Sequence, residues 1–208
     1  MKYTFPLAWT VTMLSWSAIE HRAVLEQVGE WKNLMKVIDW GVDWLLKANP
    51  EPRVLYAVIG DPKVDHEFWG RPQDQSVPRP CIKITRWNHG TDLAAEVAAA
   101  FAAASKVVSN AAKASKCWQK AQELYDFGDK HRGKYSDVVK EVADYYPSDD
   151  YTDELAWGAV WLYRAARTEI DKIKYMARAK SAYKTFQLGR RVKSFNWDQK
   201  HAGVQVSQ

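Results

Sequence analysis

The residues best suited to chemistry lie in the stretch 54–79, which is rich in Gly, Pro, Asp and aromatic residues. Seven consecutive positions in it supply a carboxylate, an imidazole, two aromatic rings and a guanidinium: Asp65, His66, Phe68, Trp69 and Arg71. Hydrogen-bonding groups beside flat apolar rings suit a polyhydroxylated ligand. A loop packed by its own side chains would have the same composition, so the residue types alone leave both interpretations open.

A second stretch, residues 134–151, is also rich in aromatic side chains, and apolar residues recur at helical spacing on either side of both stretches. We expect helices at 5–28, 30–48, 91–109, 111–131, 153–166 and 169–187. In each successive pair, a largely apolar helix precedes an amphipathic one, which predicts an all-α fold of stacked helical hairpins. Such layers close into a toroid or stay open as a solenoid. In a toroid, both stretches would lie on one face.

The amino terminus also has features of a secretory signal, because Lys2 precedes a short apolar run that ends in small residues. However, the apolar spacing continues beyond this run as far as Val28. We therefore expect residues 5–28 to form one helix of the mature fold and assign no signal peptide.

The composition is that of one globular domain, because 47% of the 208 residues are hydrophobic and 26% are charged. The net charge is +5, and one basic cluster, residues 172–193, holds eight Lys or Arg. This cluster fits the solvated side of a helix whose inner side carries Ile170 and Ile173, so we predict no nucleic-acid binding. Cys81 and Cys117 could pair, but they form no disulfide framework and have no metal-ligand spacing.

Six blocks of the sequence resemble, in order, successive blocks of the family 9 glycoside hydrolases, which include endo-β-1,4-glucanases. The blocks are KYTFPLAWTVTMLSWSAIE, LYAVIGDPKVDHEFWGRPQD, TDLAAEVAAAFAAAS, AQELYDFGDKHRGKYSD, YTDELAWGAVWLYRA and FNWDQKHAGVQV. This resemblance implies an (α/α)6 toroid of six helical hairpins. Residues 1–208 then correspond to the central part of a single catalytic domain, truncated at both ends.

The resemblance also implies an inverting hydrolase, in which one carboxylate acts as base on a water and a carboxylic acid protonates the leaving oxygen. The family base lies in an Asp-Ala-Gly-Asp motif just before the block that starts at Lys2, and the acid lies near the domain's end. Neither motif is present, so we expect a fragment without either catalytic carboxylate. The alternative is a shortened, non-catalytic protein that binds glucan or serves as a helical scaffold.

Further expectations follow from the family. The partner would be a β-glucan such as cellulose, the full-length protein would be a secreted monomer, and no cofactor would be required. His66 matches a histidine beside the cleaved sugar, where a neutral imidazole can donate to a hydroxyl; the alternative is a loop histidine bonded to backbone. Trp69 and Arg71 match the family's Trp-x-Arg-Pro block, whose residues shape the cleft floor; the alternative for Trp69 is a packing role. Tyr145 and Tyr146 match an aromatic pair lining the sugar subsites, although this loop is one residue shorter than the family pattern.

Two neighbouring acidic residues, Asp153 and Glu154, invite assignment as the catalytic pair. On a helix their side chains point about 100° apart, which is poor geometry for flanking one glycosidic bond. In some family members the matching residues bind calcium together with a later aspartate, here Asp198. The resemblance thus makes these three residues candidate ligands of a structural calcium, since hard oxygen ligands suit that ion. The alternative is that both acids compensate the dipole of a helix that begins beside them.

Overall fold

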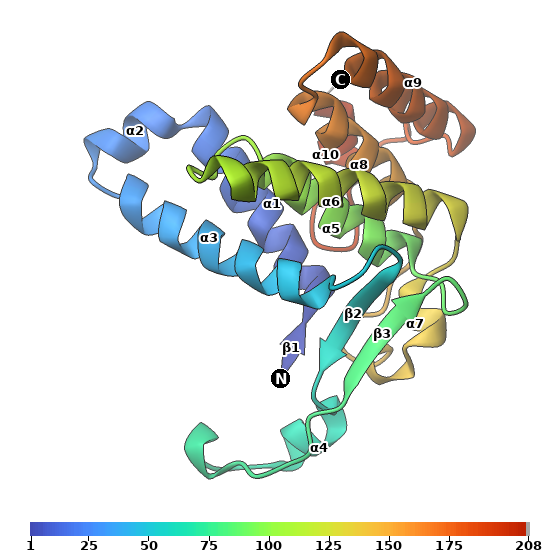
Figure 1. The fold of residues 1–208 in the computed structure, drawn as a ribbon. Helices are drawn as coiled ribbons and strands as arrows, with labels where there is room; N and C mark the ends of the chain where they lie inside the picture. The colour runs from blue at the N-terminus through green and yellow to red at the C-terminus, as the bar shows by residue number, and fades with distance from the viewer. Residues whose placement is uncertain (207–208) are drawn as a thin grey trace.

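Three helical hairpins form most of the computed structural model, which describes residues 1–206 (Figure 1). Their helices are α1 (Thr4–Glu20), the short α2 (Arg22–Gln27) and α3 (Trp31–Ala48), then α5 (Thr91–Ala104) and α6 (Ala111–Lys130), then α8 (Thr152–Ala165) and α9 (Glu169–Thr185). The first long helix of each hairpin lies inside: α5 packs between α1 and α8, while α3, α6 and α9 pack outside their partners. This order confirms the prediction of stacked hairpins that form part of a toroid.

The composition of α5 explains why it lies at the centre. All fourteen of its residues are buried, and most are alanines, whose small side chains let neighbouring helices approach closely. Gly158 of α8 lies at one such approach, since a Cβ at this position would be only 3.0 Å from the Ala95 carbonyl oxygen. A side chain there would push α8 away from α5. The small residues therefore set the spacing of the inner helices.

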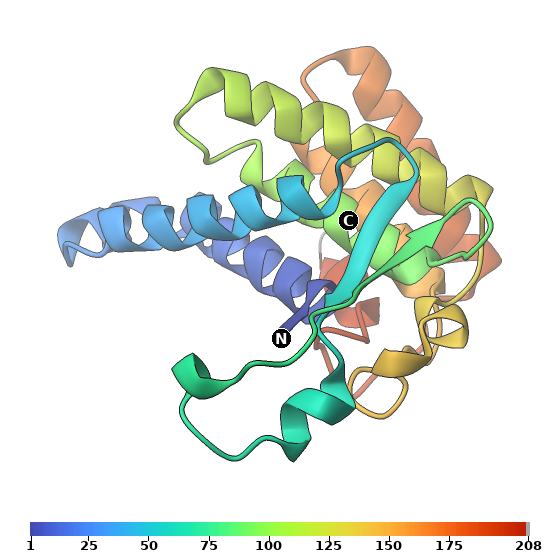
Figure 2. The same cartoon turned by 60° about the horizontal axis from the view of Figure 1, so that its bottom comes forward.

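A small sheet accompanies the helices, and the all-α prediction did not anticipate it. Its strands are β1 (Lys2–Tyr3), β2 (Val54–Ile59) and β3 (Cys81–Thr85), antiparallel in the order β1-β2-β3. Leu55, Ala57 and Val58 of β2 are buried, so the strand has an inner face against the helices. We had expected residues 54–79 to form one long loop. Instead, β2 and β3 form a hairpin whose far end carries α4 (Pro62–Glu67) and the 3-10 turn η1 (Pro72–Asp74) (Figure 2).

The second stretch and the carboxyl-terminal segment contain short elements only. These are α7 (Tyr135–Val138), the 3-10 turn η2 (Lys140–Val142) and α10 (His201–Val206). The segment that precedes α10 returns to the inner helices, and α10 packs on α8. No helix in the described residues is long and apolar enough to cross a bilayer.

Two expectations about the helices were wrong, one about bounds and one about a buried face. The expected helix 5–28 is interrupted at His21, where the chain bends between α1 and α2. In α9, Ile170 and Ile173 are 80% and 70% exposed, whereas we expected them to face the core. The buried side of α9 instead carries a tyrosine and two alanines: Tyr175, Ala179 and Ala182. Small residues at this spacing allow α9 to pack closely on its partner, an effect that outweighs the hydrophobicity of the isoleucines.

Candidate functional site

Aromatic side chains from three distant parts of the chain form one wall, which we call the aromatic wall: Tyr3, Tyr145, Tyr146 and Trp197. The Tyr3 and Tyr146 rings have centroids 4.6 Å apart, and the Tyr146 ring meets Trp197 edge to face at 5.2 Å. Tyr145 lies 6.2 Å from Tyr3. Both predicted tyrosines therefore lie in one half-buried group. The Tyr135 hydroxyl donates to the Tyr146 carbonyl oxygen, which fixes the backbone of the pair.

His66 lies beside this wall, with its ring 4.6 Å from that of Tyr145. It belongs to α4, whose amino terminus is capped by Asp61 through the backbone N–H groups of Lys63 and Val64. The exposed imidazole keeps one nitrogen for its own helix, because Nδ1 is 2.7 Å from the carbonyl oxygen of Pro62. The structure thus brings the two predicted stretches together through His66 and Tyr145.

The contact between His66 and Pro62 decides what the free nitrogen can do. A carbonyl oxygen only accepts hydrogen bonds, so Nδ1 must carry the proton and Nε2 of the neutral ring is an acceptor. We expected a neutral imidazole to donate to a sugar hydroxyl, but in this geometry the free Nε2 of the neutral ring can only accept a hydrogen bond from a hydroxyl. Of the two alternatives for His66, backbone bonding applies to Nδ1 and leaves Nε2 for a ligand.

Tyr3 is part of the wall that the sequence analysis did not single out. Its hydroxyl is buried and has no hydrogen-bond partner among the described residues. Burial, with Tyr145 and Tyr146 nearby, raises the pKa of the Tyr3 phenol to about 12. The hydroxyl therefore stays protonated at neutral pH and can still donate a hydrogen bond. Its only sequence signal is its place in the KYTF block, two residues before the buried Phe5.

Trp69 and Arg71 lie apart from the wall, on the far end of the β2–β3 hairpin. The Trp69 side chain is completely exposed, and the Arg71 guanidinium donates to Asp74, with Nε 2.8 Å from Oδ2. Figure 2 shows this end of the hairpin extending away from the helices. The two residues form an arm beside the site, which we call the loop arm. An exposed indole offers a flat apolar face to a ligand, but it packs against nothing in this structure.

One of the three acidic residues considered for calcium, Glu154, pairs with Lys200, whose side chain is fully buried. The Lys200 ammonium is 3.0 Å from Glu154 Oε1 and 3.3 Å from Glu96 Oε2. Burial raises the pKa of Glu154 well above its ordinary value. Burial alone would lower the pKa of Lys200, but Glu154 and Glu96 more than offset this and raise it. Lys200 therefore carries the positive charge of this cluster.

The other two candidate ligands face different partners. Asp153 Oδ2 accepts from the Lys200 backbone N–H at 2.5 Å and lies 3.2 Å from Nδ1 of His201. Although burial opposes ionisation, the neighbouring His201 ring and the hydrogen bond from the Lys200 backbone lower the pKa of Asp153. Asp198 Oδ1 accepts from the backbone N–H of Asp149, and burial raises the pKa of Asp198 to about 6.

The arrangement does not fit one calcium ion held by all three side chains. Within residues 1–206, no group of three or more His, Cys, Asp or Glu side chains is placed to hold a metal. Each of the three carboxylates is already bonded to a group of the protein, and Glu154 faces an ammonium. The calcium prediction therefore finds no support in the geometry.

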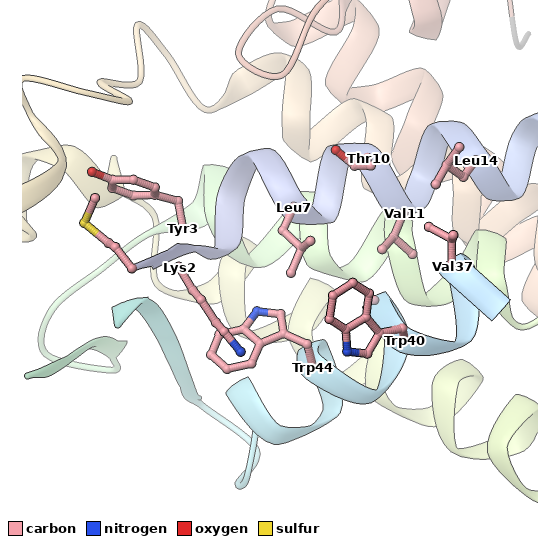
Figure 3. A pocket seen from close by; sticks show the side chains of 11 residues that line it. Lys2, Tyr3, Leu7, Thr10, Val11, Leu14, Val37, Trp40 and Trp44 are labelled. Atoms are coloured by element: carbon pink, nitrogen blue, oxygen red, sulfur yellow. The ribbon is translucent and has the colours of Figure 1, made fainter. Parts of the chain in front are cut away.

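A pocket of about 360 Å³ lies between α1 and α3, and Tyr3 of the aromatic wall is one of its lining residues. Figure 3 shows Leu7 and Val11 of α1 pointing toward Trp40 and Trp44 of α3. The Lys2 ammonium lies 4.3 Å from the centre of the Trp44 ring. Trp40 is 78% exposed at the edge of the pocket, although its spacing along the helix is typical of a core residue. The lining is mostly apolar and contains no cluster of acids or bases that could do chemistry.

A sequence model described as glycosyl hydrolase family 9 matches residues 1–208. The chain belongs to glycosyl hydrolase family 9. It is 41% identical over 210 residues to Endoglucanase 22 of Oryza sativa subsp. japonica, a match that covers 99% of this chain and 37% of the rice protein. It is 42% identical over 209 residues to Endoglucanase 6 of Arabidopsis thaliana, with 99% of this chain and 33% of that protein covered.

Solved structures of family 9 proteins agree with the fold. The endoglucanase from the termite Nasutitermes takasagoensis superposes with a TM-score of 0.94 at 39% identity, over 99% of this chain and 47% of that chain. Cellulase Cel9M of C. cellulolyticum superposes with a TM-score of 0.88 at 24% identity, over 99% of this chain and 47% of that chain, which supports the fold alone. The chain thus spans less than half the length of these family 9 proteins.

Proposed function

We propose that residues 1–208 form part of the substrate cleft of an endo-β-1,4-glucanase and bind a β-1,4-glucan such as cellulose along the aromatic wall. In this proposal, the longer family 9 enzyme acts outside the cell and cleaves internal bonds with inversion. One carboxylate activates water while an acid protonates the leaving oxygen. Both of these groups lie in family sequence outside residues 1–208. The chain by itself therefore binds glucan without hydrolysing it.

The observation that carries this proposal is the contact between His66 and the aromatic wall. Sugar rings have apolar C–H faces and hydroxyl edges, so they bind best where a flat ring adjoins a hydrogen-bonding group. Tyr145 and Tyr146 supply the rings. His66 Nε2 accepts from a sugar hydroxyl. The plant and termite relatives are endoglucanases by name, which supports the choice of a glucan as substrate.

The test measures binding and hydrolysis separately. Cellohexaose binding to residues 1–208 is followed by isothermal titration calorimetry, and reducing-sugar release from carboxymethylcellulose is measured on the same sample. We expect saturable binding and no release. A chimera, in which residues 1–208 replace the matching part of the termite endoglucanase, should release sugar. The 39% identity and TM-score of 0.94 make this replacement structurally reasonable.

Two outcomes would contradict the proposal. Sugar release by residues 1–208 alone would show that this chain contains a catalytic acid and base, and Asp65, Asp153 and Glu154 would have to be tested. Absence of cellohexaose binding by both proteins would favour the alternative of a helical scaffold. The control variant Trp87→Ala removes another exposed tryptophan, which lies on the loop after β3, and should leave binding unchanged.

A further inference from the structure

The buried Lys200 side chain joins the carboxyl-terminal segment to all three inner helices. Its ammonium reaches Glu96 of α5 and Glu154 of α8, as described above. It also lies 5.0 Å from the centre of the Phe5 ring and 5.2 Å from that of the Trp9 ring, both on α1. Thr12 of α1 donates to the other oxygen of Glu96 at 2.9 Å. One cation thus contacts α1, α5 and α8.

The same ammonium also donates to the carbonyl oxygen of Trp197, three residues earlier. An ammonium has three N–H donors, and here they face three acceptors: Glu96, Glu154 and the Trp197 carbonyl. Asn196 closes the turn that joins Trp197 to Lys200, because its side-chain oxygen accepts from the backbone N–H groups of Asp198 at 2.9 Å and Gln199 at 3.0 Å. The backbone of residues 196–200 is therefore held from both ends.

The Trp197 side chain projects from this turn into the aromatic wall. Its ring meets Tyr146 at 5.2 Å and Phe5 at 5.6 Å, edge to face in both cases. Burying an ammonium with two carboxylates is expensive in free energy and often adds nothing to stability compared with apolar side chains. Here the ammonium hydrogen-bonds to Glu154 and to the Trp197 carbonyl and forms an ion pair with Glu96, and a buried ion held on three sides in this way fixes one position of the chain. Here the position that it fixes is that of Trp197.

We propose that Lys200 is a positioning residue for the sugar-binding wall: it holds the turn at residues 196–200 against α1, α5 and α8 and thereby keeps the Trp197 ring on Tyr146. This inference rests on the proposed function for its link to sugar. Its structural part, the placement of Trp197 by Lys200, can be tested without any sugar.

The test uses three variants of residues 1–208. In Lys200→Met combined with Glu96→Gln and Glu154→Gln, the cation and both carboxylates become neutral together, so no unpaired charge is left buried. Lys200→Arg keeps the buried positive charge and so protects folding, but its planar guanidinium cannot present three N–H donors in the same directions. Lys180→Met is the control, because Lys180 is exposed on α9 and lies outside the turn.

The first readout is the fluorine NMR signal of Trp197 in protein labelled with 5-fluorotryptophan, assigned with a Trp197→Phe variant. The second is cellohexaose affinity. In the triple variant and in Lys200→Arg, we expect the Trp197 signal to shift and broaden while far-ultraviolet circular dichroism is retained. We expect the affinity to fall about tenfold, toward the upper limit of what one aromatic pair contributes. Lys180→Met should change neither readout.

Each outcome decides the inference. An unchanged Trp197 signal in a folded Lys200 variant overturns it, and so does a variant whose affinity falls without any change in that signal. If neither Lys200 variant folds, Lys200 supports the whole fold and the specific positioning role is rejected. If the wild-type chain does not bind cellohexaose, the proposed function fails, while the Trp197 signal still shows whether Lys200 places the ring.

Discussion

The aromatic wall and the loop arm adjoin the same site but are held in opposite ways. Tyr146 and Trp197 rest on buried groups, including an ammonium and two carboxylates that tie three helices together. Trp69 and Arg71 lie on an exposed hairpin end, where the indole packs against nothing. The wall is thus preorganised, whereas the arm must lose freedom when a ligand orders it. Changes behind the wall should alter stability, and changes in the arm should alter binding alone.

Truncating the core behind the wall should have the largest effect. Trp157 of α8 is fully buried and packs against the rings of Trp9, Trp16 and Trp161. We expect Trp157→Ala to lower the free energy of unfolding by about 3–5 kcal/mol, because it loses apolar burial and leaves a cavity. Urea denaturation followed by circular dichroism measures this. A loss below about 1 kcal/mol would mean that this core is not tightly packed around the indole.

The support of the wall should also depend on pH through Asp92. This fully buried carboxyl accepts from the backbone N–H of Tyr135, whose hydroxyl bonds to Tyr146. Burial, partly opposed by hydrogen bonds from Ser148, Leu93 and Tyr135, raises the pKa of Asp92 from 3.8 to about 7. An acid whose pKa is higher in the folded state stabilises the fold in its protonated form. That stabilisation is complete below the unfolded pKa and is lost as the pH rises through about 7.

The wild-type protein should therefore lose stability between about pH 4 and pH 7 relative to Asp92→Asn. Asparagine resembles the protonated acid, so the variant lacks this loss. Each unit of pKa difference corresponds to about 1.4 kcal/mol, which gives an upper limit of about 4 kcal/mol. The measurement compares thermal unfolding of both proteins across this range. Parallel pH profiles for the two proteins would show that Asp92 titrates normally.

The wall itself should matter mainly for binding. Tyr146→Ala removes the ring that contacts Tyr3 and Trp197. Because Tyr146 is only half-buried, we expect a loss of about 1–2 kcal/mol in unfolding free energy and a fall of about tenfold in cellohexaose affinity. Calorimetry measures the affinity, and Tyr146→Phe is the matched control that keeps the ring. Equal affinities for the alanine variant and wild type would remove Tyr146 from the site.

The sequence predicted the supports of the wall better than its contacts. The helix expected at residues 30–48 is observed as Trp31–Ala48, because its amphipathic spacing is a local signal. The sheet was missed because β2 pairs with Lys2–Tyr3, more than fifty residues away, and no local pattern encodes that partner. Composition also gave no hint that Lys200 lies in the core. An isolated lysine predicts solvent exposure, and one of its partners, Glu96, is over a hundred residues earlier.

Some residues of the candidate site could likewise be predicted from the sequence, and others could not. Family resemblance predicted His66, Tyr145 and Tyr146, and these three residues do lie together, although whether they bind sugar stays a prediction. The direction of the hydrogen bond from His66 could not be predicted, because it depends on the Pro62 carbonyl and thus on the exact start of α4. Tyr3 was missed, since its role depends on contacts with residues over a hundred positions later.

In the loop arm, Trp69→Ala should leave stability unchanged and weaken binding. Its side chain is completely exposed, so its removal should change the free energy of unfolding by less than about 0.5 kcal/mol. If the arm closes over a bound glucan, the indole contacts sugar, and affinity for cellohexaose should fall about fivefold. Trp87→Ala, which removes a second exposed indole, is the control and should change neither quantity. Destabilisation by Trp69→Ala would show that the arm packs onto the wall in solution.

Removing divalent ions should have the smallest effect on stability, because the Lys200 ammonium already supplies a positive charge to the carboxylates behind the wall. Lys200 lies among carboxylates that could otherwise attract calcium, and Asp153 and Asp198 are bonded to backbone N–H groups. A ligand that binds only the folded state raises its stability by mass action. We therefore expect the thermal midpoint to be the same with excess calcium and with a chelator. A calcium-dependent rise that disappears in Asp198→Asn would mean that these carboxylates rearrange around a metal ion, and the wall would then rest on an ion from solution as well as on Lys200.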